Sequence, residues 1–328
     1  MTTPQYDVPV LYLVFNRPDH TRRSFEAIRA RRPTRLFVAA DGPRAHALND
    51  WQRTEEVRRI ATAVDWPCDL RTFFRAVNVG SRTAIPKAIS WFFTQVSEGI
   101  ILEDDCVPND SFFTFCAELL ARYRNHPRIS SIAGTNPLDG LSRHTEDRSA
   151  SYYFSRYSHT WGWATWRRAW LNRQNLPTDP RVRRAASTRA LRNAQIRNPI
   201  SRIFWARTIR NRVLVDVPNW DYHWQVSLWS QDLLSIIPSV NLITNIGYGE
   251  ESTNTTWAES PLAERPTFSL PEPLTHPKNV TRSAQADAYF ERKYVIPHLV
   301  FGHAKRRCMS ALKARRSLSF VRSWRHEK

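Results

Sequence analysis

The sequence predicts an α/β protein whose mainly parallel sheet is covered by helices on both faces. Short apolar runs alternate with amphipathic helical segments through the first third of the 328-residue chain, which is the rhythm of a parallel sheet. The runs themselves, such as VLYLVF at 10–15, are continuously apolar, which indicates strands buried on both faces. The composition, 41% hydrophobic and 12% aromatic, is that of a globular protein with ample length for a core.

Strands and helices alternate in the predicted order. The expected strands cover 10–15, 36–40, 69–74, 99–102 and 129–133. The expected helices cover 19–32, 51–64, 82–96 and 111–123, and Asp19 is expected to cap the first of them. Ligands of such sheets bind outside the carboxyl ends of the strands, so the residues that follow each strand are the first candidates for a site.

From about residue 136 the chain becomes aromatic and rich in arginine. In WGWATWRRAW, Trp163, Trp166 and Trp170 are spaced three and four apart, which predicts one buried face of a helix. Gly162 lets the backbone pass close to a bulky neighbour. In NWDYHWQ, a second helix is expected to bury a stripe of tryptophans.

The chain carries a formal net charge of +18, which favours anionic partners: nucleic acid, phosphorylated ligands or an acidic membrane face. The four cysteines lack CxxC spacing, which argues against a zinc site or a redox dithiol. The N-terminus MTTPQYDVPV lacks the features of a signal peptide, and no apolar run approaches the ~20 residues needed to span a bilayer. We therefore expect a reduced, cytoplasmic setting.

Polar residues follow three of the predicted strands, at Asn16–Arg17, at Asp41 and at Glu103–Asp105. Because the carboxyl ends of parallel strands meet at one edge of the sheet, these clusters should converge there. The next position along this edge carries further polar groups that we include as candidates, namely Asn78, Arg82 and Lys87.

The acidic cluster EDD needs a positive partner, because three adjacent carboxylates repel one another. If the chain stays extended, Glu103 and Asp105 point to one side and Asp104 to the other. Oxygen-only ligands suit a hard dication, Mg²⁺ or Mn²⁺, which is usually held by one or two carboxylates and substrate phosphates. The alternative is a solvated acidic turn that caps the helix starting near Asp110.

The other candidates also admit two interpretations. Asn16 and Arg17 are suited to a nucleotide or phosphate, or form a turn. Asp41 is suited to a base or ribose, or forms the D-G turn after its strand. Asp221, in NWDYHWQ, is either the N-cap of its helix or a general base whose pKa is raised among aromatic residues.

Five stretches occur in the order found in GT-A-fold glycosyltransferases: VPVLYLVFNRPDHTRRSFEAI, LFVAADGPR, EGIILEDDCVPNDSFFTFCAELL, WGWATWRRAW and NWDYHWQ. Together they resemble the eukaryotic mannosyl-glycoprotein N-acetylglucosaminyltransferases and their bacterial relatives, often labelled family 2 or hemolytic-protein-like. The resemblance covers roughly residues 8–256. It implies a GT-A fold and an inverting transfer from a nucleoside-diphosphate sugar, a UDP sugar such as UDP-GlcNAc, with Mn²⁺ or Mg²⁺.

The resemblance also implies roles for individual residues. Arg17 matches the arginine that contacts the nucleotide, and Asp41 matches the aspartate that reads the uracil. Asp105 matches the metal ligand. Asp221 matches the catalytic base. Glu103 and Asp104 match residues on the donor sugar and ribose. In the segment GEESTNTTW, where bacterial members often carry a histidine, this chain has Asn254, which implies weaker or altered metal binding.

The predicted organisation follows from the resemblance and the composition. Residues 1–135 form the nucleotide-sugar-binding half, and 136–258 the acceptor and catalytic half of the same domain. Residues 259–328 form a proline-rich connector and a basic helical tail. The expected partners are a nucleotide-sugar donor, a glycan or lipid-linked acceptor for surface glycan synthesis, and an anionic membrane in peripheral contact.

Two rival functions remain open from the sequence. A sugar nucleotidyltransferase of similar fold would release pyrophosphate and would need no base at Asp221. A nucleic-acid-binding protein is suggested by the net charge and by the arginines interleaved with aromatic residues at 181–212, although no nucleic acid is expected as a partner.

Overall fold

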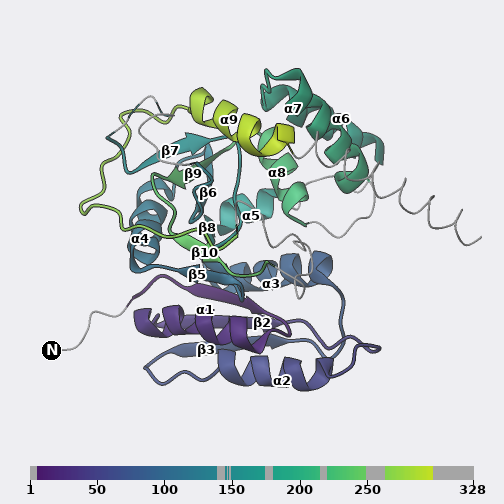
Figure 1. The fold of residues 1–328 in the computed structure, drawn as a ribbon, viewed down its shortest axis with the longest axis vertical. Coiled ribbons are helices and arrows are strands. Elements are labelled where there is room, and N and C mark those ends of the chain that lie inside the picture. The colour runs from purple at the N-terminus through teal and green to yellow at the C-terminus, as the bar shows by residue number, and fades with distance from the viewer. Residues whose placement is uncertain are drawn as a thin grey trace, which may run out of the picture.

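The structure is a computed structural model that describes residues 6–138, 145, 147, 149–173, 180–214, 220–248 and 263–297. An eight-stranded sheet forms its centre, and helices cover both faces (Figure 1). The strand order is β3-β2-β1-β4-β8-β6-β9-β7, with β7 and β8 antiparallel to their neighbours and the other strands parallel. The predicted α/β fold class, with a large and mostly parallel sheet flanked by helices, is confirmed.

The strands of the large sheet are β1 (Val10–Val14), β2 (Arg35–Ala40), β3 (Asp69–Phe74), β4 (Glu98–Glu103), β6 (Ile129–Ala133), β7 (Tyr152–Ser155), β8 (Trp163–Trp166) and β9 (Leu234–Pro238). A separate antiparallel pair joins β5 (Cys106–Pro108) to β10 (Ile243–Asn245). The predicted strands over 10–15, 36–40, 69–74, 99–102 and 129–133 are all present, within a residue or two at each end.

The helices are α1 (Pro18–Arg31), α2 (Asp50–Ala61), α3 (Ser81–Gln95), α4 (Asp110–Tyr123), α5 (Arg167–Arg173), α6 (Pro180–Asn193), α7 (Pro199–Thr208), α8 (Trp220–Ser230) and α9 (Ala284–Phe290). Short π-helical turns at Ile209–Val213 and Glu291–Val295 extend α7 and α9. No helix in the described ranges is long and apolar enough to cross a membrane.

Alternate residues of the central strands divide the core between the two faces of the sheet. Tyr12 faces one side, where α1, α2 and α4 pack. Leu11 and Leu13 face the other side, where α3, α5 and α8 pack. Burial on both faces explains why the central strands are apolar throughout rather than alternating.

Two sequence-based predictions about helix boundaries are wrong. Asp19 does not cap α1, because the helix begins one residue earlier, at Pro18, and proline sets the first helical φ angle without a side-chain cap. The WGWATW stretch is not helical, because Trp163–Trp166 forms β8 between β4 and β6. Trp163 and Trp166 therefore lie on opposite faces of the sheet, and the helix begins only after Trp166.

Gly162 does permit a close approach, as predicted. Its φ is +60°, and a Cβ at this position would lie 2.5 Å from Ile243 Cδ1. Its carbonyl oxygen accepts a 2.7 Å hydrogen bond from Gly134 N. Gly162 thus lets β10 lie against the turn that leads into β8.

Strands from beyond residue 135 complete the same sheet that begins with β1, because β7, β8 and β9 extend it. The described part of the proline-rich connector, 263–283, runs outside regular helix and strand along α4 and β7. Leu270 N donates to Ser111 Oγ at 3.1 Å, and Thr275 N donates to Ser151 Oγ at 2.8 Å. Most of the expected basic tail lies outside the described residues.

Candidate active site

The end of β4 lies beside the end of β1 in the sheet, because Glu103 is the register partner of Leu13. Arg17 follows β1 and precedes α1. Its Nη2 binds Asp104 Oδ1 and, at 3.0 Å, Asp105 Oδ2. The predicted convergence of polar clusters at the carboxyl edge of the sheet is therefore present for β1 and β4, and Arg17 is the positive partner of the acidic cluster within the protein.

The acidic cluster does not alternate in the way an extended chain would. β4 ends at Glu103, and the chain turns at Asp104 and Asp105 before β5 begins. Because of this turn, both aspartates face Arg17. The acidic cluster does not cap α4 either. The N-cap of that helix is Asn109, whose side chain accepts a hydrogen bond from Phe112 N.

Negative charge exceeds positive charge in this cluster. The cluster has three carboxylates, and only Asp104 and Asp105 contact the guanidinium group of Arg17 among the described residues. The side chains of Asp104 and Arg17 are 4% and 15% exposed. Burial raises the pKa of Glu103 well above its usual value, and the charges of Asp105 and Asp104 raise it further. Burial also raises the pKa of Asp104, although Arg17 opposes this shift. A dication or a second cationic group would relieve this excess.

The chain after β10 closes the cluster from the other side. β10 pairs with β5, which directly follows Asp105, and Ile246 N then donates to Asp105 O at 2.9 Å. Gly247 lies so close to Asp105 that an added Cβ would be 2.7 Å from the aspartate Cβ. Gly247 is not among the site residues predicted from the sequence. The signal was a single glycine after a short apolar run, which has no distinctive spacing.

Asp221 lies in the first turn of α8 and is partly buried. It is the second helical residue, so it is not the N-cap. Burial raises the pKa of Asp221, while the N–H groups of Tyr222 and of Asp221 itself, and the charge of Arg212, oppose the shift. The charge of Asp221 in turn raises the pKa of Glu103, which places its carboxylate within electrostatic reach of the acidic cluster.

A cluster of tryptophans holds α8 in this position. Trp163 on β8 stacks on Trp220 with a centroid distance of 6.0 Å, and it lies 5.6 Å from Trp224. Trp163 is also the register partner of Ile101, two residues before Glu103. The start of α8, and Asp221 with it, is therefore packed near the end of β4.

The predicted burial of these tryptophans is confirmed, although Trp163 and Trp166 lie on a strand rather than a helix. Trp163, Trp166, Trp170 and Trp224 are at most 1% exposed, so they form core. Trp161 is partly exposed and packs edge-on against Tyr248 at 5.8 Å, and Tyr248 directly follows Gly247. This pair therefore lies next to the segment that closes the acidic cluster.

Asp41 binds backbone rather than side chains. Its carboxylate accepts from Gly42 N at 2.9 Å, from Val79 N at 3.1 Å and from Gly80 N at 2.9 Å. Asn78 Nδ2 in the same loop donates to Gly42 O at 2.9 Å. Asp41 therefore holds the loop before α3 at the end of β2, and no turn is present at 41–44. Its contact with a uracil stays a prediction.

Asn16 belongs to a second polar network that the sequence analysis did not find. Asn16 Nδ2 donates to Asp50 Oδ1 at 2.5 Å, and Arg44 donates to the same carboxylate through Nη2 at 2.7 Å and Nε at 3.0 Å. Hydrogen bonds from Arg44 lower the pKa of Asp50 to about 2. Asp50 begins α2, so in the sequence it looks like an ordinary acidic residue at a helix start.

The remaining candidates lie on α3 or outside the described ranges. Arg82 is the second residue of α3, at the same edge of the sheet. Lys87 is exposed and lies six residues after the start of the helix, about 9 Å along its axis. Lys87 is thus not brought into the cluster of Arg17 and Asp105. Asn254 falls outside the residues that the structure describes.

The donor set suits a hard dication rather than zinc. The groups at the cluster are carboxylate oxygens with a surplus of negative charge. Within the described residues, no three or more His, Cys, Asp or Glu side chains are arranged as a metal site. An ion that takes one or two carboxylates and completes its shell with phosphates fits these residues, and Asp105 is less buried than Asp104.

Comparison of the sequence with protein families and with curated proteins finds no match. Among solved structures, HddC from Yersinia pseudotuberculosis is 9% identical over 49% of this chain and 77% of its own, with a TM-score of 0.31. A putative glucose-1-phosphate thymidylyltransferase from Bacillus anthracis is 7% identical over 52% of this chain and 75% of its own, with a TM-score of 0.33. The roles of the site residues therefore rest on this chain's own geometry.

Proposed function

We propose that this chain is a metal-dependent inverting glycosyltransferase that moves a sugar from a nucleoside-diphosphate sugar, a UDP sugar, to an acceptor hydroxyl. The observation that carries the proposal is the acidic cluster at the carboxyl edge of the sheet, together with a separate, partly buried carboxylate, Asp221, on a helix that packs near the end of β4. The cluster has more carboxylates than Arg17 can neutralise, and Asp221 lies within electrostatic reach of Glu103.

The surplus negative charge supports a site for Mn²⁺ or Mg²⁺ at Asp105. Anionic carboxylates and an anionic diphosphate repel one another unless a cation lies between them. Such an ion, when bound, supplies Lewis-acid stabilisation of the charge on the departing diphosphate. We assign Arg17 to the nucleotide phosphate, and Glu103 and Asp104 to the donor sugar and ribose.

Asp221 is the residue that we assign as the general base. It takes the proton from the acceptor hydroxyl while that oxygen attacks the anomeric carbon from the face opposite the diphosphate, so one displacement inverts the configuration. Its raised pKa favours this role, because a carboxylate with a higher pKa is a stronger base. The tryptophan cluster behind Asp221 fixes its position near the end of β4.

Screening nucleotide sugars for Mn²⁺-dependent turnover tests the reaction class. A glycosyltransferase releases nucleoside diphosphate, including by slow hydrolysis when no acceptor is present. A sugar nucleotidyltransferase, the alternative, instead releases pyrophosphate from a nucleoside triphosphate and a sugar phosphate. Formation of pyrophosphate with no nucleoside diphosphate would transfer the assignment to that class.

Two variants separate the roles of the carboxylates. Asp105→Ala is expected to abolish both transfer and Mn²⁺-dependent UDP binding in calorimetry, whereas Asp221→Asn is expected to abolish transfer and keep that binding. Asp110→Asn, at an exposed position at the start of α4, is the control for loss of one carboxylate. Equal Mn²⁺-dependent UDP binding by wild type and Asp105→Ala would refute the metal assignment.

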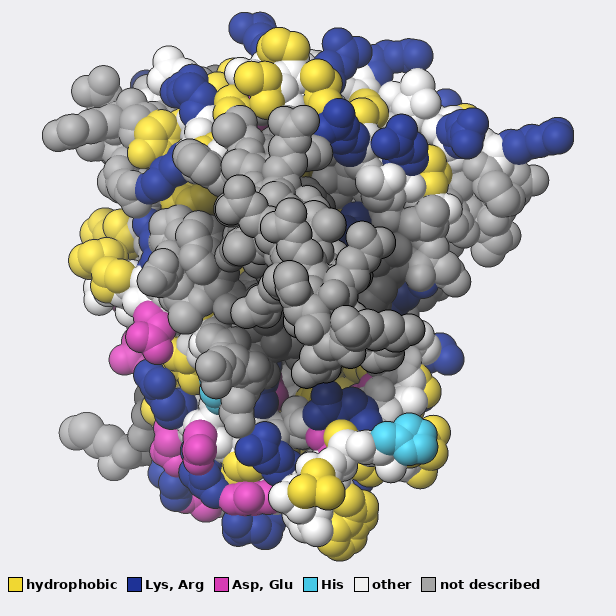
Figure 2. Space-filling model, turned by 45° about the vertical axis from the view of Figure 1, so that its right-hand side comes forward, with side chains coloured by type: hydrophobic (Ala, Val, Ile, Leu, Met, Phe, Trp, Pro, Cys, Tyr) yellow, Lys and Arg dark blue, Asp and Glu magenta, His cyan; other side chains and the backbone are white. Residues whose placement is uncertain are grey.

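We also propose that the acceptor side faces an anionic membrane, as suits a lipid-linked acceptor. Between 180 and 214 the chain has ten arginines and no acidic residue. On α7, Ile200 and Ile203 are 40% and 49% exposed. Lys and Arg side chains gather around apolar ones in the upper part of Figure 2, at the level of α6, α7 and α9. Basic and apolar side chains together favour binding at a lipid headgroup layer.

Sedimentation with vesicles tests this contact. Wild type is expected to sediment with vesicles that contain phosphatidylserine and not with neutral ones, and Ile200→Ser with Ile203→Ser is expected to weaken sedimentation. Equal partitioning of wild type and the double variant would exclude α7 as the contact.

A further inference from the structure

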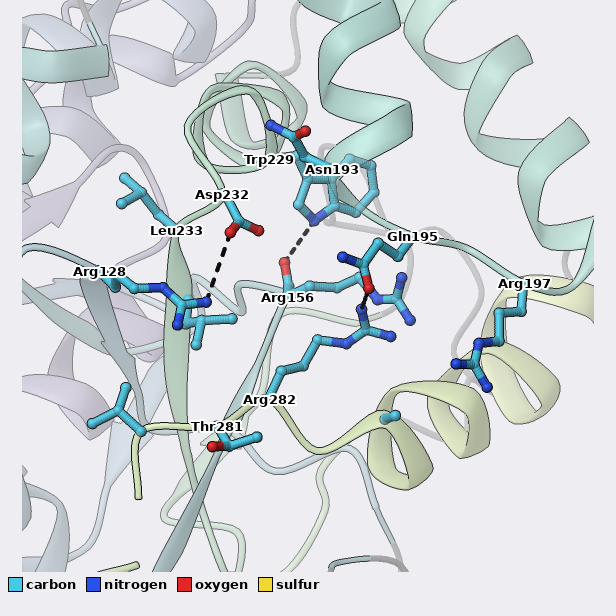
Figure 3. A pocket seen from close by; sticks show the side chains of 13 residues that line it. Arg128, Arg156, Asn193, Gln195, Arg197, Trp229, Asp232, Leu233, Thr281 and Arg282 are labelled. Atoms are coloured by element: carbon cyan, nitrogen blue, oxygen red, sulfur yellow. Dashed lines mark hydrogen bonds and ion pairs between the residues drawn. The ribbon is translucent and has the colours of Figure 1, made fainter. Parts of the chain in front are cut away.

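A second polar pocket lies at the opposite edge of the sheet from the acidic cluster. Its volume is about 300 Å³, at the lower end of small-molecule sites. It lies where β6 and β9 begin and where the antiparallel β7 ends (Figure 3). The pocket is lined by Arg128, Arg156, Asn193, Gln195, Arg197, Trp229, Asp232, Leu233, Leu234, Val280, Thr281, Arg282 and Ala284.

Helix α8 separates this pocket from the candidate active site. Asp221 lies in its first turn, and Trp229 in the pocket wall lies in its last turn. Eight residues of α-helix correspond to about 12 Å along the axis. The pocket is therefore not a part of the site that contains Asp105 and Asp221.

Positive charge dominates the lining of this pocket. It contains four arginines and one carboxylate, Asp232, whose side chain is 61% exposed. Two buried carboxylates behind the wall offset part of this charge. Asp287 binds Arg156 Nε at 3.1 Å and Arg282 Nε at 2.7 Å, and Glu291 lies 3.5 Å from Arg156 Nη2. The lining and the two carboxylates behind it together contain four guanidinium groups and three carboxylates.

Arg156 has one donor nitrogen that these carboxylates do not use. Its side chain is 5% exposed, and its Nη1 is buried without a hydrogen-bond partner among the described residues. A buried charged donor left without a partner is costly and therefore rare in folded proteins. In Figure 3 the Arg156 guanidinium lies next to that of Arg282, and Arg282 Nη1 donates to Gln195 Oε1 at 3.3 Å.

We propose that this pocket binds a small phosphate-bearing ligand whose phosphate oxygens accept hydrogen bonds from Arg156 and Arg282. Guanidinium groups are the side chains best suited to bidentate contact with phosphate. Arg197, exposed at the rim, adds positive charge on the side that faces α9 (Figure 3). The remaining volume accommodates a substituent of the size of a monosaccharide. A phosphosugar or the head of a phosphorylated acceptor thus has the matching chemistry.

A purely structural role for Arg156 is the competing explanation. Arg156 ties β7 to α9 through Asp287, and that role requires neither Arg197 nor a free Nη1. A variant at Arg156 alone would therefore not distinguish the two roles, because it leaves Asp287 buried with one partner fewer. Arg197 provides the cleaner test, since its side chain is exposed and no ion pair within the described chain depends on it.

The test uses the full chain and calorimetric titration with inorganic phosphate and with glucose 1-phosphate, at constant ionic strength and with a chelator. We expect saturable binding of both probes, weakened about tenfold in Arg197→Ala, because the positive charge that Arg197 adds at the rim is lost. Arg202→Ala, an exposed arginine of α7 outside the lining, is the matched control and should bind like wild type. Arg282→Gln should weaken binding at least as much as Arg197→Ala.

Several outcomes would overturn the proposal. The first is that folded wild type shows no saturable binding in the millimolar range, and the second is that Arg197→Ala and Arg202→Ala weaken binding equally. The third is that glucuronate binds as tightly as glucose 1-phosphate, which would indicate a carboxylate site. Asp105→Ala should bind inorganic phosphate like wild type. Loss of phosphate binding in that variant would place the bound anion at the acidic cluster instead. Because a chelator is present, the result does not depend on the proposed transferase activity.

Discussion

The acidic cluster and the arginine pocket have opposite charge arrangements at the two edges of one sheet. In the acidic cluster, one arginine, Arg17, bridges two carboxylates, Asp104 and Asp105. In the pocket wall, one carboxylate, Asp287, bridges two arginines, Arg156 and Arg282. Each bridge neutralises only part of the local charge, so each leaves a surplus of one sign.

The difference between the two regions indicates which ligand each would accept. A surplus of carboxylates suits a cation, and a bound cation in turn attracts an anionic diphosphate. A surplus of guanidinium groups suits the anion directly. Within the described residues, a single arginine contacts those carboxylates, so an acidic site is present in a protein with a net charge of +18.

The largest expected effect concerns the acidic edge. Asp221→Asn should lower the rate of transfer by about 10²–10⁴-fold, because general-base catalysis is lost. In wild type the rate should fall as the pH drops through the pKa of Asp221, since only the ionised form accepts a proton. That pKa is raised, so the fall should begin at a higher pH than for an ordinary aspartate.

Initial rates across the acidic pH range measure both effects. Asp110→Asn, the same change at the exposed start of α4, should leave the rate and its pH dependence as in wild type. A transfer rate for Asp221→Asn within threefold of wild type would remove Asp221 from the mechanism.

The next effect concerns the stability of the arginine pocket. Asp287→Asn should lower the free energy of unfolding by about 3–5 kcal/mol, because two buried guanidinium groups lose their shared partner. Asp232→Asn should change it by less than about 1 kcal/mol, because Asp232 is exposed and pairs with Arg128 at 3.7 Å. Urea denaturation followed by circular dichroism measures both. Similar losses in the two variants would mean that the buried bridge contributes little.

A smaller effect should separate geometry from charge at the acidic cluster. Gly247→Ala adds a Cβ against the Asp105 side chain, which must then move. We expect Mn²⁺-dependent UDP binding to weaken about 10–100-fold, as for other changes that misplace a metal ligand. UDP binding without metal and the melting temperature serve as internal controls. Unchanged Mn²⁺-dependent binding would show that Asp105 is free to adjust.

The smallest effect concerns the acid response near α9. Burial lowers the pKa of His159 to about 4, and its ring packs edge-on against Phe290 at 5.2 Å. In the unfolded chain His159 binds a proton below about pH 6.5, whereas in the folded chain it does so only near pH 4. The free energy of unfolding therefore falls as the pH drops from about 6.5 to about 4. His159→Gln should reduce the fall in melting temperature by roughly 2–4 °C. An identical pH profile would assign the acid response to other groups.

The parallel part of the fold was predictable because its strands are buried on both faces. Runs such as Val10–Val14 are apolar throughout, and the helices between them are amphipathic. β8 was not predictable in this way. Its tryptophans at 163 and 166, followed by Trp170, imitate helical spacing, and only pairing with β4 and β6 makes the first four residues a strand. Long-range pairing thus overrode a local pattern.

The candidate site was predictable in its position and less so in its contacts. Residues after β1, β2 and β4 lie at one edge of the sheet because parallel strands share a direction. The turn after Glu103 and the network of Asn16 with Asp50 depend on contacts between distant segments, which no local spacing encodes. The arginine pocket is of the same kind, because its lining comes from segments far apart in the sequence.

The contacts of Asp41 have a consequence for altering the protein. The loop at 77–80 is attached mainly through its backbone N–H groups, while the side chains of Val77 and Val79 are 67% and 37% exposed. These two positions should therefore accept diverse residues with little cost to folding, which makes them suitable for combinatorial mutagenesis. Gly42 is the opposite case, because any Cβ there would lie 2.5 Å from Val77 Cα.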